Sequence, residues 1–353
     1  MKKIYLLVIA VFIGSSVCGQ SLAGVESIEY DPINNRYLAS SDNTSIVAIA
    51  PNGALSHFGS GAQASHGMEV FGGKLYAIDG STIRCYDLVT ESLVFSTPIS
   101  GAQFLNGMAS NGVDSLWFTD FSGKDIYAMD VNQPQNYTMV VQNIQEQPNG
   151  IAYDGANNRC VFVTWGTGKV KAMDLNTYNV TNIISNTGLS NIDGIDRDDN
   201  GDWFLSAWTP ASITKYQSDF SSVIETLNVP GIYQPADICY STETDTLAIP
   251  GANQVIFIGF ENPGVGMEEE NFESHRIYYN AGFPVIQFDF LQAQEAQLEV
   301  LDMNGRVVYS ILEGQQPKGK HTVVLSSIGL YSGTYICRLA SKELSFTERV
   351  IIP

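Results

Sequence analysis

The sequence predicts an all-β protein, a six-bladed β-propeller followed by a small Ig-like β-sandwich. Short apolar runs rich in β-branched and aromatic residues alternate with turns of Asp, Asn and Gly, and no segment of 11 or more residues holds a helical apolar period. This pattern recurs six times at intervals of 40 to 44 residues, a period typical of propeller blades. The period is lost after residue 260, which separates a second, smaller β module from the repeats.

Each repeat begins with a residue that we call its axial residue, because the first strand of a blade lines the central axis and its first residue points inward. The six axial residues are Glu26, His66, Asn106, Asn149, Asp193 and Ala236. Blade four shows the pattern clearly, with strands expected at 149–154, 160–165 and 170–174. The other expected strands are 26–31, 37–40 and 46–49 in blade one, 75–79 and 83–87 in blade two, 116–120 and 126–130 in blade three, 193–196, 203–206 and 213–216 in blade five, and 237–240, 246–249 and 255–258 in blade six.

The N-terminal residues 1–19 have the pattern of a signal peptide that is not part of the fold. Lys2 and Lys3 precede an apolar run over 4–13, and small residues at 17–19 are typical of a leader peptidase site. The run is too short to remain as a membrane span, and no later segment approaches 18 apolar residues. We therefore expect an exported, soluble monomer without a transmembrane segment.

The propeller is expected over 20–260. Because only residues 20–25 then precede Glu26, we expect blade six to be three-stranded or to take its outer strand from beyond Phe260. A Gly/Pro-rich and acidic linker follows over 261–275. The ring closure is thus left open between two arrangements.

The tail, 276–353, is a small all-β module with turns at Asn304-Gly305 and Lys318-Gly319. Its runs over 298–309, 332–339 and 347–352 closely resemble the C-terminal sorting domain of the type IX secretion pathway. The resemblance implies handling by the type IX secretion machinery, passage across a Bacteroidetes-type outer membrane, and release or anchoring at the cell surface. The alternative is an ordinary Ig-like appendage.

Charge and cysteine content narrow the function classes. Asp and Glu total 37 against 18 Lys and Arg, a formal charge of −19, so nucleic acid is excluded as a partner because a phosphate backbone needs clustered Lys and Arg. The acidity is compatible with cation binding and equally with solubility outside the cell. After leader removal four cysteines remain in separate repeats or domains without a CxxC pair, and we expect them to be small buried hydrophobes: Cys85, Cys160, Cys239 and Cys337.

The axial residues predict a cation site. Glu26, Asn149 and Asp193, supplemented by Asn106, offer carboxylate and amide oxygens, which suit Ca²⁺ or another divalent cation, whereas zinc is disfavoured by the absence of thiolates. Taken singly, Asn-Gly and Asp-Gly are turn dipeptides. Their common phase in the repeat favours the metal site, and axial polar residues that only hold water are the alternative.

Several stretches carry a family resemblance. Glu26, the run 149–154 and the run 193–204 look like the metal-ligand blades of the six-bladed calcium-dependent hydrolases that include gluconolactonase, regucalcin and the paraoxonases. Asn106 matches a further asparagine of this family, and His66-Gly-Met is similar to the run that places an imidazole above the metal in paraoxonase-like members. The resemblance covers roughly residues 20 to 260.

The resemblance implies a metal held by Glu26, Asn106, Asn149 and Asp193 that polarises a lactone or ester carbonyl and lowers the pKa of the attacking water. Proton removal would fall to Asp193, as in the gluconolactonase branch, or to His66, as in the paraoxonase branch. We prefer His66, because an imidazole is better matched to neutral pH than a metal-bound carboxylate. The rival hypothesis is a non-catalytic propeller that binds glycan or protein at the cell surface and keeps the ion as structure.

Other motifs add no further chemistry. The loop 196–201 begins like an EF-hand, but Ala207 stands where the bidentate Glu belongs, so we expect a hairpin turn. Phe104 and Leu105 stand where gluconolactonases place a basic residue beside the asparagine of the third blade. Blade packing, rather than a substrate platform, is the preferred explanation of the four tryptophans, Trp117, Trp165, Trp203 and Trp208.

Overall fold

The computed structural model describes residues 7–10, 22–42, 44–51, 53–227, 229, 231–260, 276–280, 283–290, 292–302, 305–325, 330, 333–342 and 345–352. The chain divides into two compact units, residues 1–262 and 263–353. The linker predicted over 261–275 and most of the predicted signal peptide lie outside the described residues. Within the described ranges, no helix has the length and apolar character that a membrane crossing requires.

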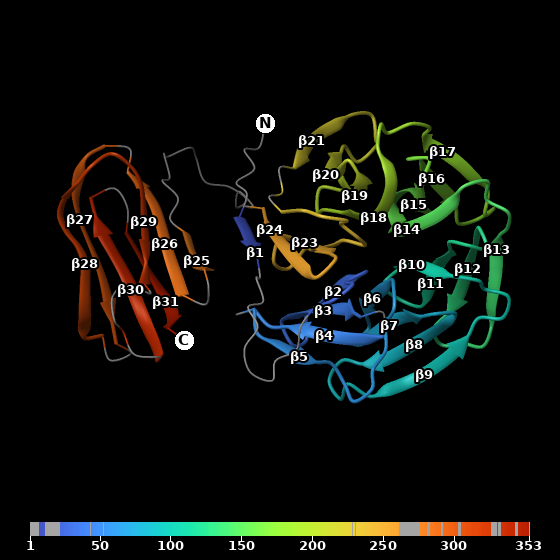
Figure 1. Ribbon diagram of the computed structural model, residues 1–353, viewed down its shortest axis with the longest axis horizontal. Helices are drawn as coiled ribbons and strands as arrows, with labels where there is room; N and C mark the ends of the chain where they lie inside the picture. The colour runs from blue at the N-terminus through green and yellow to red at the C-terminus, as the bar shows by residue number, and fades with distance from the viewer. Residues whose placement is uncertain are drawn as a thin grey trace. The chain divides into compact units, whose positions relative to one another are not determined.

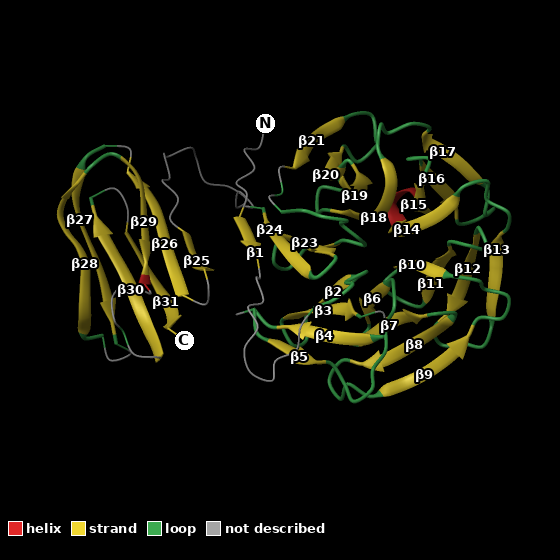
Figure 2. Ribbon diagram, in the orientation of Figure 1, coloured by secondary structure: helices red, strands yellow, loops and turns green. Residues whose placement is uncertain are grey.

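The first unit is the predicted propeller, with six four-stranded antiparallel blades arranged around a common axis (Figure 1). Strands dominate, and the short 3₁₀ turn η1 (Gly155–Asn157) follows β14 (Figure 2). Blades one to three are β2 (Ile28–Asp31), β3 (Arg36–Ser41), β4 (Ser45–Ile49) and β5 (Leu55–His57); β6 (Met68–Phe71), β7 (Lys74–Asp79), β8 (Thr82–Asp87) and β9 (Leu93–Pro98); and β10 (Leu105–Ser110), β11 (Ser115–Asp120), β12 (Asp125–Asp130) and β13 (Tyr137–Val141).

Blades four to six complete the ring. They are β14 (Gln147–Asp154), β15 (Arg159–Trp165), β16 (Val170–Asp174) and β17 (Val180–Ile184); β18 (Ser190–Arg197), β19 (Trp203–Thr209), β20 (Ala211–Tyr216) and β21 (Val223–Leu227); and β22 (Cys239–Ser241), β23 (Thr246–Gly251) and β24 (Gln254–Gly259) with β1 (Leu7–Ala10). The all-β class and the six-bladed architecture are therefore confirmed.

The sequence pattern missed the outer strand of each blade. β5, β9, β13, β17 and β21 lie at the outer edge, where one face is exposed to solvent; Leu93 and Val94 of β9, for example, are 51% and 49% exposed. Their residues mix exposed and half-buried positions, so they lack the apolar runs that mark the three inner strands.

Ring closure differs from both expected arrangements. β1 pairs antiparallel with β24, Val8 opposite Ile258, and supplies the fourth strand of blade six. This segment lies within the predicted signal peptide, so the expectation that nothing in 1–19 joins the fold is wrong for the full-length chain. The physical reason is that an apolar, β-branched segment satisfies the edge of an equally apolar strand. The signal peptide itself stays a prediction.

Blade packing supplies the core. Six hydrophobic clusters each lie between two neighbouring blades, so every blade buries both faces. Trp203 is fully buried with Val163 between blades four and five, and Phe162 is fully buried with Trp117 between blades three and four. The cysteines Cys85, Cys160, Cys239 and Cys337 are buried free thiols, as expected.

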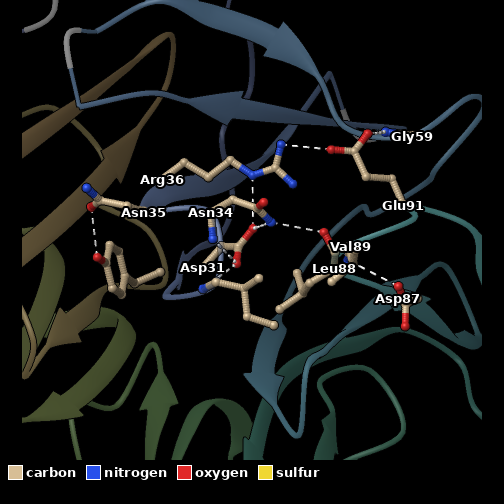
Figure 3. Close-up of polar contacts among 11 residues, drawn as sticks. Asp31, Asn34, Asn35, Arg36, Gly59, Asp87, Leu88, Val89 and Glu91 are labelled. Atoms are coloured by element: carbon tan, nitrogen blue, oxygen red, sulfur yellow. Dashed lines mark hydrogen bonds and ion pairs between the residues drawn. The ribbon is translucent and has the colours of Figure 1, made fainter.

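Polar contacts also join adjacent blades, as the network between blades one and two shows (Figure 3). Asp31 is fully buried, accepts from Arg36 Nε at 2.9 Å, and closes its turn by accepting from the backbone of Asn34. The same guanidinium reaches Glu91 of blade two at 2.8 Å, and Glu91 accepts from the Gly59 N–H at 2.9 Å. The buried carboxylate is thereby paired and hydrogen-bonded, as a charge in this position requires.

The inner strands crowd one another at the axis. The residue after the axial residue is glycine in blades two to five, Gly67, Gly107, Gly150 and Gly194. A Cβ on Gly107 would lie 2.5 Å from the carbonyl oxygen of Asn149. A Cβ on Gly150 would lie equally close to the carbonyl oxygen of Asp193. These glycines are present because the neighbouring backbone occupies the space of a side chain.

The second unit is a two-sheet β-sandwich, which confirms the Ig-like module. One sheet contains β25 (Arg276–Asn280), β26 (Phe283–Phe290) and β29 (Gly319–Val324); the other contains β28 (Val307–Gln316), β27 (Gln294–Leu301), β30 (Gly333–Ser341) and β31 (Ser345–Ile352). Its core includes Phe288, Phe290, Leu298 and Leu339, all essentially fully buried. It has a hydrophobic core of its own, as an independent domain requires.

We predict that Gly150→Ala destabilises the propeller by about 1–3 kcal/mol or more, because the added methyl group meets rigid backbone. Urea unfolding measures the change. The control is Gly188→Asn, at an open position with φ of +79° where Asn adopts the left-handed conformation more readily than other side chains, and it should cost less stability than Gly150→Ala. Equal effects of the two substitutions would contradict the crowding argument.

Candidate metal centre at the propeller axis

Local backbone irregularities aim the axial side chains. Asn106, Asn149 and Asp193 lie inside the first strands β10, β14 and β18, and the pairing of each strand with its neighbour shifts register at that point. Such a bulge redirects a side chain and bends the strand. The Asn-Gly and Asp-Gly pairs are therefore not hairpin turns. The turn interpretation of these dipeptides is wrong.

Hydroxyl groups of the second strands hold this geometry from blade to blade. The N–H of Gly107 donates to Thr119 Oγ1 at 2.9 Å, and that hydroxyl donates to the carbonyl of Asn149 at 2.9 Å. In blade five, the N–H of Gly194 donates to Ser206 Oγ at 2.7 Å, and the hydroxyl donates to the carbonyl of the next axial residue, Ala236, at 2.7 Å. Each relay fixes the position of one axial residue relative to the next.

Two of the predicted ligands are in direct contact. Asn149 Nδ2 donates to Asp193 Oδ1 at 3.1 Å and to the carbonyl of Ile192 at 3.2 Å. Glu26 lies within electrostatic range of the same carboxyl, since its charge helps to raise the pKa of Asp193. Asn149 is 1% exposed, and its Oδ1 is a buried acceptor that no donor within the described ranges satisfies. An oxygen of this kind beside two carboxyl groups fits a hard cation.

The acids of this group are enclosed. Burial raises the pKa of Glu26, and burial followed by the charges of Glu26 and Asp237 raises the pKa of Asp193 well above its usual range. The Trp208 indole lies close enough to Asp193 to lower that pKa in part. The carboxyl groups thus repel one another in the absence of a cation, and a bound cation would relieve that repulsion.

A second group of acids, which the sequence analysis missed, lies next to the first. Burial raises the pKa of Glu69 to about 8 and that of Asp196 to about 6, and burial together with neighbouring carboxyls raises the pKa of Glu29 and Asp237 well above the usual range. Three of them, Glu29, Glu69 and Asp196, stand three positions after an axial residue. This common spacing is the sequence feature from which these acids could have been predicted. Asp237 occupies the position of the crowded glycines and contacts Ser27 Oγ at 3.3 Å.

His66 lies at the same end of the inner strands. Its Nδ1 is 2.9 Å from Ser65 Oγ, whose hydroxyl donates to the carbonyl of Ile78 at 3.2 Å. This arrangement favours the tautomer in which Nδ1–H donates to Ser65 and Nε2 keeps its lone pair. Burial lowers the pKa of His66 to about 4, so the ring is neutral at pH 7. The expectation that its pKa matches neutral pH is wrong, because the site is desolvated.

The candidate cation site needs an amide oxygen among its ligands. Among the described residues, no three His, Cys, Asp or Glu side chains converge closely enough to hold a metal ion by themselves. The amide oxygen of Asn149 is therefore essential to any cation site built on Glu26 and Asp193. Asn106 belongs to the same ring of inner strands, since its carbonyl accepts from the Gly67 N–H at 2.8 Å.

The four tryptophans divide into two pairs. Trp117 and Trp203 are 7% and 0% exposed and stack on Tyr153 and Phe220, so blade packing explains them. Trp165 and Trp208 are only half-buried and contact each other edge to face, with ring centroids 4.9 Å apart. This contact joins the second strands of blades four and five.

Comparison with known proteins first concerns the tail. Residues 280–353 match the family described as the secretion system C-terminal sorting domain. The tail is a type IX sorting domain. The sorting domain includes all but the first strand of the second unit, and it assigns the chain to export at the outer cell surface. A comparison of the whole sequence with curated proteins gives no match.

Solved structures share the propeller fold at low identity. A gluconolactonase from Xanthomonas campestris is 13% identical, with a TM-score of 0.59 over 72% of this chain and 90% of that one. A calcium-binding protein, regucalcin, from Agrobacterium tumefaciens is 15% identical, with a TM-score of 0.56 over 68% of this chain and 91% of that one. A putative gluconolactonase, 15% identical, has a TM-score of 0.58 over 72% of this chain and 92% of that one. At these identities the likeness shows the fold.

We predict that the cation-free protein loses stability as the pH rises from about 4.5 to about 8. Glu69 keeps its proton in the folded state over this window, whereas the unfolded chain loses it near its ordinary pKa of 4.5. The contribution of the protonated Glu69 carboxyl to the free energy of unfolding is therefore full below pH 4.5 and declines as the pH rises to about 8. Glu69→Gln should flatten the decline, measured by urea unfolding at pH 5 to 8 with chelator.

The matched control is Asp174→Asn, at a turn where bonds from Thr177 hold the pKa of the carboxyl below its usual range. Its effect should be the same at every pH in the window, because Asp174 does not titrate there. A Glu69→Gln variant with the same pH dependence as the parent protein would contradict the assignment.

Proposed function

We propose that the protein is an exported hydrolase of lactones or related esters that depends on a divalent cation, with calcium as the expected ion. The observation that supports the proposal is the hydrogen bond between Asn149 and Asp193, within electrostatic range of Glu26, together with the buried amide oxygen of Asn149, which has no donor among the described residues. The occurrence of this fold in a gluconolactonase and in the calcium-binding regucalcin supports both the activity and the ion.

The residues proposed to hold the ion are Glu26, Asn106, Asn149 and Asp193. When bound, a divalent cation supplies Lewis acidity, which polarises a carbonyl group and lowers the pKa of water. Asn149 Nδ2 donates to Asp193 Oδ1 at 3.1 Å and so holds the amide group beside the carboxyl group.

His66 is proposed to take the proton of the attacking water. Ser65 anchors Nδ1 and leaves the lone pair of Nε2 available. Hydrolysis adds one water across the acyl C–O bond: the hydroxyl joins the carbonyl carbon, and the leaving oxygen receives the proton. A base with a pKa of about 4 binds that proton weakly, so His66 also returns it readily to the leaving oxygen. Asp193 is the alternative base.

We predict that calcium raises the unfolding temperature of the parent protein, because an ion that binds only the folded state stabilises it. Glu26→Gln and Asp193→Asn should abolish this increase. Lactone hydrolysis should fall about 100-fold or more in each variant and on addition of chelator, a loss typical of removing a charged group from a reacting centre.

The control is Asp219→Asn, at an exposed turn, which should keep both the calcium response and the activity. Turnover that neither chelator nor the two axial variants reduce would contradict the metal mechanism. Calcium binding without turnover of any lactone or ester would instead favour the non-catalytic surface propeller.

We predict that, at saturating calcium, the acid limb of the rate of hydrolysis, followed as kcat/KM, includes a component near pH 4, because burial lowers the pKa of His66 to about 4. His66→Gln should reduce the rate about 10²- to 10⁴-fold while calcium still stabilises the variant. If His66→Gln instead leaves the acid limb and the rate in place, Asp193 is the base.

A further inference from the structure

A groove of about 270 Å³ lies between blades three and four, and we call it the side groove. Its floor is one face of blade three, made mainly by alternate residues of β11, β12 and β13. Its far wall is Tyr178, which belongs to the turn between β16 and β17 of blade four. The axial residues lie on the first strands, whereas the side groove is built on the second to fourth strands, so the two sites are separate.

The register of the sheet explains why this face is hollowed. Trp117 lies opposite Ala128, and Ala128 lies opposite Thr138, so the three side chains form one row across the same face. Ala128 carries only a methyl group between two larger neighbours, which leaves the space above it open. Ser115 and Asp130 lie opposite each other in the next row and also line the side groove.

The equivalent junction between blades one and two is bridged by an ion pair. Arg36 begins β3 as Ser115 begins β11. Glu91 occupies the place of Tyr178 in the turn of blade two, since both have a positive φ, +54° and +57°. Arg36 and Glu91 pair at 2.8 Å and join the two blades (Figure 3). The short Ser115 side chain bonds instead to Asp114 at 2.8 Å, so no such bridge crosses the side groove.

The indole N–H of Trp117 lacks a partner in this row. The side chain is 7% exposed and stacks on Tyr153 with ring planes 6° apart, and its Nε1 finds no acceptor in the described part of the chain. The buried Trp203, by contrast, donates to the carbonyl of Ser218 at 3.1 Å. A buried donor without an acceptor costs free energy, so an oxygen atom of a ligand would be favourable here.

The lining suits a neutral ligand that carries hydroxyl groups. Within the described ranges no Lys, Arg or His lines the side groove, and Asp130 adds a negative charge, so anions are disfavoured. Tyr178 is 38% exposed and offers a ring, and Thr138 offers a hydroxyl. A sugar ring has apolar C–H faces that pack on an aromatic ring and hydroxyls that both donate and accept. It can therefore serve Trp117 and Asp130 at the same time.

A peptide strand has fewer partners in the side groove. The main chains of β11, β12 and β13 are paired with one another across the floor, so a peptide on this face could not extend the sheet. The volume of about 270 Å³ is also below the range of about 300 to 1,000 Å³ that is usual for larger ligands. One ring of a longer glycan is the occupant that these features favour.

We propose that the side groove binds one pyranose ring of a neutral glycan. Trp117 Nε1–H donates to an oxygen of the sugar, and Tyr178 packs against its apolar face. This site goes beyond the proposed function, because it contains none of the axial residues and needs neither the cation nor turnover. It would attach the exported protein to a polysaccharide and leave the axis free.

The test titrates the full chain with neutral tetrasaccharides of glucose, mannose, galactose and N-acetylglucosamine in the presence of chelator. The readout is the NMR signal of the Trp117 indole N–H, identified among the four tryptophans by its loss in Trp117→Phe. A new hydrogen bond should shift this signal downfield with at least one tetrasaccharide, whereas the anionic tetramer of galacturonic acid should leave it in place. Trp117→Phe and Tyr178→Asn should each weaken binding, measured by calorimetry, about three- to tenfold.

The matched control is Glu91→Asn, the same replacement at the equivalent turn position of blade two, which should leave glycan binding unchanged. Ala128→Leu fills the side groove and should abolish binding, with circular dichroism to verify the fold. It also replaces Trp117→Phe if that variant unfolds. The proposal is overturned if no neutral tetrasaccharide shifts the indole signal, or if Tyr178→Asn and Ala128→Leu both bind as the parent protein does.

The axial variant Asp193→Asn separates this inference from the proposed function. Glycan binding that persists in Asp193→Asn and with chelator supports the side groove, whatever the outcome for lactone hydrolysis. Glycan binding that disappears in that variant or with chelator would place the sugar at the axis and refute the side groove.

Discussion

The first strands of neighbouring blades approach so closely at the axis that in four of them a Cβ after the axial residue would collide with the next strand. This approach is what allows residues separated by more than 40 positions in sequence to contact one another, as Asn149 and Asp193 do at 3.1 Å. The hydroxyls of Thr119 and Ser206 fix the spacing, since each bonds to both of the crowded strands. Crowding of the backbone therefore determines the geometry of the candidate site.

A consequence of this convergence is electrostatic. The charge of Glu26 helps to raise the pKa of Asp193 and of Asp237, and Asp237 is linked in the same way to Glu29, Glu69 and Asp196. Carboxyl groups in such a cluster must keep protons or acquire a cation, because mutual repulsion and burial both disfavour the charged forms. The folded protein tolerates the cluster while its carboxyl groups are protonated. A bound cation would remove the repulsion between the ionised groups, so cation binding would stabilise the folded protein at neutral pH.

The sequence predicted the blades because inner strands buried on both faces leave a continuous apolar signature with a fixed period. The outer strands β5, β9, β13, β17 and β21 were missed because one exposed face mixes polar and apolar residues. Ring closure through β1 was missed because Leu7–Ala10 had been assigned to a leader. Glu26, Asn149 and Asp193 were found by their phase in the repeat. Glu29, Glu69 and Asp196 each lie three positions after an axial residue. The sequence alone did not show that this position is also buried among acids, because it depends on the register shift within the inner strands.

The same topology places two kinds of chemistry side by side. First strands begin where second strands end, so polar axial residues and the ends of β15 and β19 share one side of the blades. In blades three to five those ends carry Phe121, Trp165 and Trp208, and the ring of Phe104 contacts His66 at 4.6 Å. An apolar wall beside a neutral imidazole also explains why the pKa of His66 is low, since the rings exclude water that would stabilise its charged form. Removing the Phe104 ring would therefore raise the pKa of His66, because water would reach the imidazole.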